Sequence, residues 1–387
     1  MDVLIQGAGI AGLTLAFWLD RLGHHPTIVE QSPRLRDEGY GLDFFGPGYE
    51  VAATMGLLAD LERIHYPLAA ITFVDGAGRT RASLDYATLR QKVLAGRHFI
   101  LMRGDLERLL YTQLEGRVPV RFSTTLTSFE QDASHVHVRF SDGTSGDCDL
   151  LVGADGLHSA VRKAAFGPEE QFERFLGYHT AAYILDKPVG PRDAWTTLSV
   201  PNRQVGVYPV RGDRTATFFI HQARPRPGQF TPELARQELR AVYGDLGWIV
   251  PELLAGLDAS SSLYFDRVSQ IVLPTWSAGR VTLVGDGCGC VSLIAGQGAS
   301  MAMAGAYALA QSLAAERALA VALARYERDI KPEVERKQRA GRRFARWFVP
   351  DSPWRVAFQA ISLRAANIRV LAPLIRRQFG LGSGVKL

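Results

Sequence analysis

The chain has 387 residues, of which 47% are hydrophobic and 21% charged, and its formal net charge is +5. These values predict a globular protein with an ample core, built as two or three domains or as one large α/β body with an insertion. No apolar run reaches the roughly 18–20 residues of a membrane span, and MDVLIQGAG lacks the basic start of a signal peptide. The three cysteines, Cys148, Cys288 and Cys290, are too few for a disulfide framework and favour a reducing cytoplasm.

Positive charge gathers toward the C-terminus, where residues 331–387 hold 13 Lys and Arg against 3 Asp and Glu. Such a segment can contact anionic lipid or nucleic acid. The sequence has no zinc-finger spacing and no RNP-like aromatic motif, so nucleic-acid binding is not expected. Trp347, Trp354 and Phe358 stand among these arginines. For this segment, helices that bridge two domains are favoured over helices that rest on a membrane surface.

The first 30 residues predict a strand, a glycine-rich turn, a helix and a second strand. Residues 3–5 form a short apolar run, GAGIAG follows at residues 7–12, and residues 13–22 are apolar with helical spacing. Glu30 closes the second strand. A GxGxxG motif between strand and helix, followed by such an acid, is typical of a dinucleotide-binding βαβ unit.

Each residue of this motif has a physical role. Gly7 permits the tight turn, Gly9 has no Cβ to hold the backbone away from a pyrophosphate, and Gly12 lets helix and strand approach closely. The helix N-terminus offers free N–H groups and a positive dipole to the anion. Glu30 can accept hydrogen bonds from the ribose hydroxyls of an adenosine. The motif alone does not distinguish NAD from FAD.

The chain continues with a mixed region and then a sheet-rich one. A helix, a hairpin, a second helix, antiparallel strands, and a buried strand leading into a glycine turn are expected at residues 48–61, 70–84, 105–114, 118–149 and 149–156. Four strands and a helix that predict an inserted sheet lie at residues 174–186, 195–200, 204–210, 215–222 and 231–243. A buried strand and three helices follow at residues 280–284, 298–315, 319–345 and 354–379.

Two further Gly-Asp turns follow buried strands, GADG at residues 153–156 and GDG at residues 285–287. A single nicotinamide domain has no need of them, whereas an extended FAD lying on one large domain does. The set GAGIAG, MRGDLERLL, GADGLHSAVR and GDGCGCVSLIAGQG resembles the class A FAD-dependent monooxygenases of the p-hydroxybenzoate hydroxylase fold over nearly the whole chain. The stretch GYGLDFFGPGYEVAATMGLL is similar to the equivalent stretch of the tetracycline-inactivating members of that family.

The resemblance implies an α/β fold with a Rossmann-like FAD-binding domain, an inserted, mainly antiparallel β-sheet substrate domain, and C-terminal helices. The FAD-binding domain would comprise residues 1–170 and 274–318, and a hairpin near residues 70–100 would contribute to the substrate domain. The substrate domain would span residues 171–273. Residues 319–387 would form helices that bridge the domains.

The resemblance also implies a cofactor site. Arg103 would meet the phosphate or ribityl chain of the flavin, Asp155 the pyrophosphate region, and Asp286 the ribityl chain. Asp43 would lie near the isoalloxazine. A helix opening at residues 296–298 would direct N–H groups to the pyrimidine edge, where reduced flavin is anionic. The implied cofactor-binding set is Gly7, Gly9, Ala11, Gly12, Glu30, Asp43, Arg103, Asp155, Gly285, Asp286, Gly296, Gln297 and Gly298.

The implied reaction uses NADPH or NADH as a transient reductant and O2 as the oxidant. A flavin C4a-hydroperoxide would transfer one oxygen atom to an aromatic or polyketide-like small molecule, by hydroxylation or Baeyer–Villiger insertion. No catalytic side chain stands out, which fits chemistry carried by the cofactor. Two alternatives stay open: a flavin oxidase or dehydrogenase on the same fold, and a non-catalytic flavin-binding protein.

Cys288 and Cys290 stand where most members of the family have Ala-Ala-His or a similar run. A Cys-x-Cys pair without a neighbouring histidine or acid pair is a poor zinc site, and a redox dithiol usually has two intervening residues. We therefore expect no metal site, and we interpret both cysteines as small apolar fillers that let the flavin ring pack against backbone.

Aromatic side chains of the inserted sheet can line an apolar substrate pocket. Aromatic residues in strands serve mostly as packing, so the pattern selects few of them. The candidates are Tyr208, Phe218 and Phe219.

Overall fold

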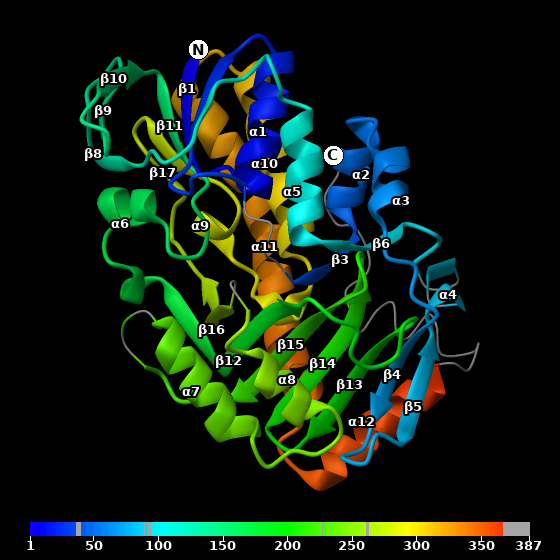
Figure 1. The fold of residues 1–387 in the computed structure, drawn as a ribbon. Helices are drawn as coiled ribbons and strands as arrows, with labels where there is room; N and C mark the ends of the chain where they lie inside the picture. Colours follow the sequence, from blue (N-terminus) through cyan, green and yellow to red (C-terminus); the bar gives the residue numbers. More distant parts are fainter. Residues whose placement is uncertain are drawn as a thin grey trace.

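The computed structural model describes residues 1–35, 40–88, 90–91, 94–226, 228, 230–260 and 263–366. In this part of the chain two large sheets lie one above the other, and a long C-terminal helix runs past both (Figure 1).

The upper sheet has six strands in the order β17-β18-β11-β1-β2-β7. Its strands are β1 (Asp2–Gln6), β2 (His25–Val29), β7 (Val120–Arg121), β11 (Leu150–Gly153), β17 (Ser277–Ala278) and β18 (Val281–Leu283). All neighbours pair in parallel except β17, which is antiparallel to β18. β1, β11 and β18 are buried along almost their whole length, which explains why each is a continuous apolar run in the sequence.

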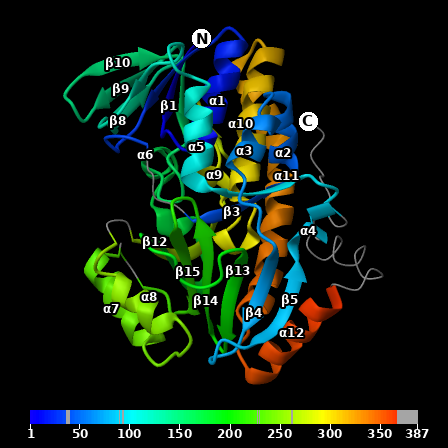
Figure 2. The ribbon, with the colours of Figure 1, turned by 45° about the vertical axis from the view of Figure 1, so that its right-hand side comes forward.

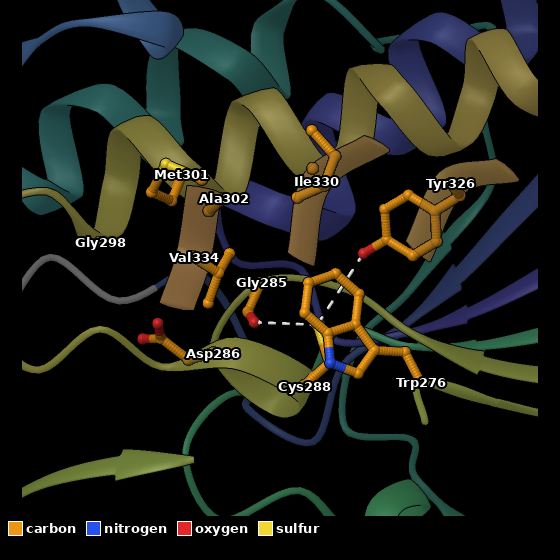
Figure 3. Close-up of a pocket in the computed structure, with 12 residues that line it drawn as sticks. Trp276, Gly285, Asp286, Cys288, Gly298, Met301, Ala302, Tyr326, Ile330 and Val334 are labelled. Carbon is orange, nitrogen blue, oxygen red and sulfur yellow. Dashed lines mark hydrogen bonds between the residues drawn. The ribbon is translucent and has the colours of Figure 1, made fainter. Parts of the chain in front are cut away.

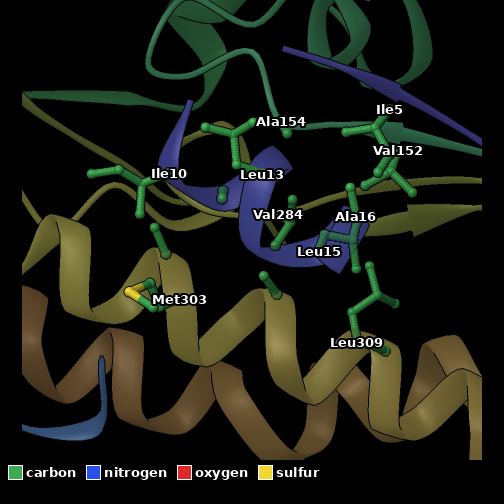
Figure 4. Packing of buried hydrophobic residues seen from close by; sticks show 14 of the residues in the cluster. Ile5, Ile10, Leu13, Leu15, Ala16, Val152, Ala154, Val284, Met303 and Leu309 are labelled. Atoms are coloured by element: carbon green, nitrogen blue, oxygen red, sulfur yellow. The ribbon is translucent and has the colours of Figure 1, made fainter. Parts of the chain in front are cut away.

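Two helices pack together beside this sheet, α1 (Ile10–Arg21) and α10 (Gly298–Ala315), and α5 (Arg103–Thr112) contacts α1. Figure 4 shows Leu13 and Leu15 of α1 in one core with Ile5 of β1 and with Met303 and Leu309 of α10. Residues 10–19 are all buried, so α1 is apolar around most of its circumference rather than along one stripe. This packing holds the start of α1 at the carboxyl end of β1.

The lower sheet has seven strands in the order β16-β12-β15-β14-β13-β4-β5. Five come from the inserted segment: β12 (Glu173–Leu185), β13 (Ala194–Val200), β14 (Arg203–Val210), β15 (Arg214–Gln222) and β16 (Tyr264–Ile271). The hairpin of β4 (Ala70–Val74) and β5 (Thr80–Asp85) joins them through parallel pairing of β4 with β13. A hairpin from early in the chain therefore completes the inserted sheet.

The lower sheet is covered on both faces. On its outer face lie α7 (Pro232–Tyr243) and α8 (Val250–Gly256), and its inner face is turned toward α11 (Leu319–Phe348) (Figure 2). The last described helix, α12 (Pro353–Ala366), packs on β5 and β13, and the rest of the helix expected to residue 379 lies outside the described residues. Among the helices of the described ranges, none combines the length and the apolar character that a membrane crossing requires.

Two small sheets flank these layers. β8 (Leu126–Gln131), β9 (Val136–Phe140) and β10 (Ser145–Cys148) form the antiparallel set expected at residues 118–149. β3 (Gly41–Phe45) and β6 (His98–Met102) form an antiparallel pair between the two large sheets, which the sequence pattern did not predict.

The single helix expected at residues 48–61 is wrong in one respect. The structure has two short helices, α2 (Pro47–Thr54) and α3 (Leu58–Ile64). Gly56 between them has φ of +79°, a left-handed conformation that ends α2.

Charged side chains join the upper and lower halves beside α6 (Ala160–Phe166). His158 Nδ1 lies 2.8 Å from Glu169 Oε1, and His158 Nε2 lies 3.0 Å from Asp266 on β16. Arg267, also on β16, contacts both Glu169 and Glu173. The hydrogen bonds that His158 donates to Asp266 and Glu169 raise the pKa of His158 to about 10.

Replacement of His158 by Gln should remove one part of the pH dependence of unfolding. Because the folded pKa is about 10 and the usual value is 6.5, the charged imidazole stabilises the fold fully below pH 6.5, and this contribution is lost as the pH rises toward 10. The difference in unfolding free energy between wild type and H158Q, measured by urea denaturation, should therefore shrink over that interval. A difference that stays constant would contradict the ion-paired state of His158.

Candidate functional site

Three glycines of the predicted cofactor motifs are required by packing. A Cβ on Gly12 would lie 2.0 Å from the carbonyl oxygen of Gly7, and one on Gly7, whose φ is +110°, would lie 2.6 Å from that of Ala154. Gly285 has φ of +67°, and a Cβ there would lie 2.9 Å from the Cβ of Ala11. The turn after β1 therefore meets the turn after β11 backbone to backbone, and the turn after β18 packs closely on Ala11 of α1, at one edge of the upper sheet.

Two other glycines have no such reason in the protein itself. Gly9 has φ of −80°, Gly298 is outside the left-handed region, and a Cβ on either would have no neighbour closer than 3.7 Å. Gly9 is the N-cap of α1 and Gly298 the first residue of α10, and neither helix has a side-chain cap. A ligand approaching the uncapped N–H groups accounts for glycine at both positions.

Glu30 lies at the carboxyl end of β2, as predicted. Its Oε2 accepts the N–H of Ala8 at 2.9 Å, and its Oε1 accepts the N–H of Ser32 at 2.9 Å. The carboxylate is half-buried and orders the glycine loop from the side where an adenosine ribose would lie.

Arg103 lies over the same loop. Its guanidinium donates to Glu107 Oε1 at 3.1 Å, and one of its nitrogens would lie 3.8 Å from a Cβ on Gly9. The charge of Glu107 raises the pKa of Arg103, against burial and with help from Tyr40. Arg103 therefore presents a permanent positive charge beside the turn where a phosphate would be bound.

Asp286 begins α9 (Asp286–Gly289), the loop after β18. Burial raises the pKa of Asp286, and the positive charge of Arg103 opposes that shift. The Cys290 thiol is its hydrogen-bonding neighbour in the described part of the chain. A half-buried carboxylate with so little local bonding fits the hydroxyl groups of a ribityl chain.

The two cysteines of this loop have separate surroundings. Cys288 Sγ lies 3.3 Å from the carbonyl oxygen of Gly285 and 3.8 Å from the Tyr326 hydroxyl, at the edge of a small void between α9, α10 and α11 (Figure 3). Cys290 Sγ lies 3.5 Å from the carbonyl oxygen of Ser269. Burial raises the pKa of the Cys288 thiol to about 12 and that of Cys290 well above its usual value. Protonated, buried sulfurs agree with their interpretation as small fillers.

The loop before α10 holds polar atoms that lack partners. Gln297 is 4% exposed, and its Oε1 has no hydrogen-bond partner among the described residues. Ser292 has φ of +81°, and its buried Oγ is also unpartnered there. Gly296 follows in a left-handed conformation with φ of +63°. Buried polar atoms without protein partners, beside glycine backbone, fit a polar ligand that supplies the missing hydrogen bonds.

Asp43 faces this loop from β3. Asp43 Oδ2 lies 4.0 Å from the Cβ position of Gly296, and Oδ1 lies 3.0 Å from His98 Nε2. His98 Nδ1 in turn lies 2.9 Å from the Tyr86 hydroxyl. Sequence reasoning missed His98 and Tyr86, because β6 was not predicted and nothing in the sequence pairs them with residue 43.

The Gly-Asp turn at residues 153–156 makes its contacts through two residues, Asp155 and Arg162. The carboxylate of Asp155 accepts hydrogen bonds from Ser159 Oγ and from the N–H groups of Ala160 and Val161, so it caps α6. Arg162, which is 0% exposed, donates to the carbonyl oxygen of Gly287 at 3.1 Å. Within the protein the Asp155 carboxylate therefore holds the start of α6, and Arg162, which the sequence did not single out, ties the turn at residues 153–156 to the loop at residues 285–287.

The three aromatic candidates divide between the two faces of the lower sheet. Tyr208 and Phe218 lie on the inner face, where the Tyr208 hydroxyl accepts the N–H of Gly41 and Phe218 contacts Phe348 of α11. Phe219 lies on the outer face, stacked on Tyr183 at 5.8 Å. Successive residues of β15 point to opposite faces, so Phe219 and Phe218 do not lie on the same face of the sheet.

Another aromatic residue belongs to the inner face. Trp195 stacks on Tyr208 with ring centroids 4.4 Å apart. A Cβ on Gly206 would lie 3.1 Å from Trp195 Nε1, so this glycine makes room for the indole. The strand pattern predicted β13 but did not indicate which face Trp195 occupies.

These features fit an extended, anionic dinucleotide. Two uncapped helix N-termini, one permanent positive charge and the unpartnered Gln297 carbonyl lie along one path from the first glycine loop to α10. One complete dinucleotide fingerprint combined with two further Gly-Asp turns defines an FAD-binding protein.

Comparison with known proteins agrees with this class. Residues 1–339 match the family described as FAD binding domain. A flavin-dependent monooxygenase from an unknown prokaryotic organism is 31% identical, over 91% of this chain and 91% of its own. The crystal structure of tetracycline destructase Tet(55) is 27% identical, covers 94% of this chain and 96% of its own, and has a TM-score of 0.82. The crystal structure of Klebsiella pneumoniae HpxO complexed with FAD and uric acid is 25% identical, covers 99% of this chain and 97% of its own, and has a TM-score of 0.81.

The chain therefore belongs to the FAD-binding domain family, and it is an FAD-dependent monooxygenase of the class A type. The sequence-based prediction of family, fold class and cofactor is confirmed.

Substitutions at the glycines should separate folding from cofactor binding. The free energy of unfolding of Gly9→Ala should differ from that of wild type by less than about 1 kcal/mol. Its FAD content per chain should be at least tenfold lower, because the added Cβ meets only the ligand. Gly12→Ala should cost about 3 kcal/mol or more, since the Cβ meets backbone. Gly76→Ala is the matched control, because its Cβ position is open and its φ is outside the left-handed region. FAD content per chain and urea denaturation measure the two effects, and full FAD retention by G9A would contradict the assignment.

Proposed function

We propose that this enzyme uses NADPH or NADH and O2 to insert one oxygen atom into a planar aromatic or polyketide-like small molecule. The supporting observation is the aromatic inner face of the lower sheet next to the Gly296–Gly298 loop. Leu293 and Ile294, directly before that loop, pack in one cluster with Phe218 and Phe348. A flat, conjugated substrate fits between such a surface and a flavin ring.

When bound, the flavin supplies hydride acceptance and oxygen activation. The N-terminus of α10 would stabilise negative charge at the pyrimidine edge, and the Gln297 carbonyl oxygen would accept an N–H of that edge. Arg103 would hold the phosphate end. The hydrogen-bonded series Asp43, His98 and Tyr86 is suited to hold or move a proton beside the ring. The inner-face aromatic residues would orient the substrate and exclude water.

Similar proteins support the substrate class. Two of the structures compared above are a tetracycline destructase and an HpxO complex with uric acid, and tetracyclines and uric acid are both oxygen-rich ring systems. The same class is proposed here from the inner face, which offers aromatic rings and few charges. The overall reaction would consume one NAD(P)H, one proton and one O2, and would release oxidised cofactor, water and the oxygenated product.

Labelled oxygen tests this reaction. Purified protein, NADPH or NADH and 18O2 are incubated with a panel of planar phenols, enols and purines that includes tetracycline and uric acid. One 18O atom should enter the product, detected by mass spectrometry, and the ring connectivity of the product distinguishes hydroxylation from Baeyer–Villiger insertion. If 18O appeared only in hydrogen peroxide and not in the product, the protein would be a flavin oxidase and the proposal would be wrong. A flavin that NAD(P)H does not reduce with any substrate present would instead indicate a non-catalytic binder.

Trp195 should contribute to substrate affinity. Trp195→Leu removes the inner-face stack and should raise the KM by up to about tenfold, the equivalent of an aromatic contact, with FAD content unchanged. Trp248→Leu is the control, because Trp248 packs against the outer-face cluster. Steady-state kinetics measures both variants, and an equal effect of the two would refute an inner-face substrate site.

A further inference from the structure

Three potential metal ligands converge on the outer face of the lower sheet. His179 on β12 and His221 on β15 are directly opposite each other in the antiparallel pairing. Glu238 lies on α7, the helix that covers this face. His179 Nδ1 lies 2.6 Å and His221 Nε2 lies 2.9 Å from the same oxygen, Glu238 Oε1. One ligand atom from each of the three residues lies within 4.8 Å of the other two.

The cluster is buried where the imidazoles lie and open at the carboxylate. Each histidine side chain is 4% exposed, whereas that of Glu238 is 21% exposed. Phe230 and Phe265 pack against the ring of His179, with centroids 4.9 and 5.7 Å away. Solvent can therefore reach the cluster past Glu238, and an aromatic wall closes the rest.

The ring nitrogens that face away from Glu238 can carry the protons, which leaves the lone pairs of the other two nitrogens facing Glu238. His221 Nδ1 lies 3.2 Å from the Tyr243 hydroxyl, the kind of second partner that orients a ligating histidine. His179 Nε2 is buried without a hydrogen-bond partner among the described residues. Next to aromatic rings an N–H is tolerated better than a bare lone pair. Placing the proton on Nε2 leaves the lone pair of Nδ1 facing Glu238.

His179 Nδ1 and His221 Nε2 both face one carboxylate oxygen, Glu238 Oε1, so the three ligand atoms point to one place. Without an ion each ring can donate its own N–H to this oxygen, whereas a metal ion would take one lone pair from each ring together with the carboxylate. Two imidazoles and one carboxylate form a ligand set that zinc takes with water in the remaining position.

We propose that His179 Nδ1, His221 Nε2 and the carboxylate of Glu238 bind one divalent transition-metal ion of the zinc type, with water completing its coordination. The ion would fasten α7 to β12 and β15. The site is distinct from the flavin site, because Phe219 and Tyr183 of the same face pack toward α7 and α8, while Tyr208 and Phe218 face the other way.

Metal titration of the flavin-loaded protein tests the proposal. After dialysis against a chelator, Zn²⁺ and Mg²⁺ are titrated separately by calorimetry, and bound metal is counted by mass spectrometry. We expect one Zn²⁺ per chain and no Mg²⁺, which prefers oxygen ligands. Glu238→Gln and His221→Asn should each weaken Zn²⁺ binding at least tenfold. His137→Asn should not, although His137 lies between Asp132 and Asp147 on the surface.

The outcomes divide clearly. Three results would overturn the proposal: no Zn²⁺ binding, binding unchanged in both E238Q and H221N, or binding lost in H137N. The first result would mean that hydrogen bonds alone join the two histidines to Glu238. Co²⁺ added to the wild-type protein gives a readout that needs no folded variant. An intense visible ligand-field band, as for a four- or five-coordinate ion, supports the site, and its absence argues against it.

Discussion

The close approach of three strand-to-turn segments at one edge of the upper sheet is the constraint on which the site depends. Gly12 meets Gly7, Gly7 meets Ala154, and Gly285 meets Ala11, each at a separation that leaves no room for a Cβ. Packed interiors do not yield by an ångström without cost. Close packing therefore holds three segments together: the glycine loop at residues 7–12 and the Gly-Asp turns at residues 153–156 and 285–287. This assembly directs the free N–H groups of α1 and α10 along one path.

Polar contacts then link this edge to the lower sheet. Arg162 reaches from α6 to the carbonyl oxygen of Gly287 and to Glu169, and a buried guanidinium is stable only when paired in this way. Glu169 also contacts His158 and Arg267, and His158 contacts Asp266 of the lower sheet. A displacement of the lower sheet would therefore also displace the loop that holds Asp286. The position of the inner face and the position of the cofactor loops are physically coupled.

Most of the fold was predictable because its signals are local. Apolar runs at residues 3–5, 149–153 and 280–284 mark buried parallel strands, and strand-like runs separated by Pro, Gly and Asp mark the strands of the inserted sheet. Gly7 and Gly12 were predictable because a turn and a close approach each demand glycine. The partners of Asp43 were not predictable, since His98 reaches it only through the pairing of β3 with β6. Arg162 was missed for the same reason, because its partner Gly287 lies 125 residues away.

The alternation of side chains in the lower sheet explains why Phe218 and Phe219 lie on opposite faces and why the two proposed sites are separate. In β15, Phe218 points toward α11 while Phe219 and His221 point toward α7. The inner face carries aromatic rings and few charges, as a surface near a flavin should. The outer face would be ordinary core, except that His179 and His221 interrupt it with two imidazoles opposite one carboxylate. Polar groups placed at that depth are costly unless they are fully satisfied. They lie on the face opposite the one proposed for the substrate, and the proposed ion, which would hold α7 against the sheet, gives them a role separate from catalysis.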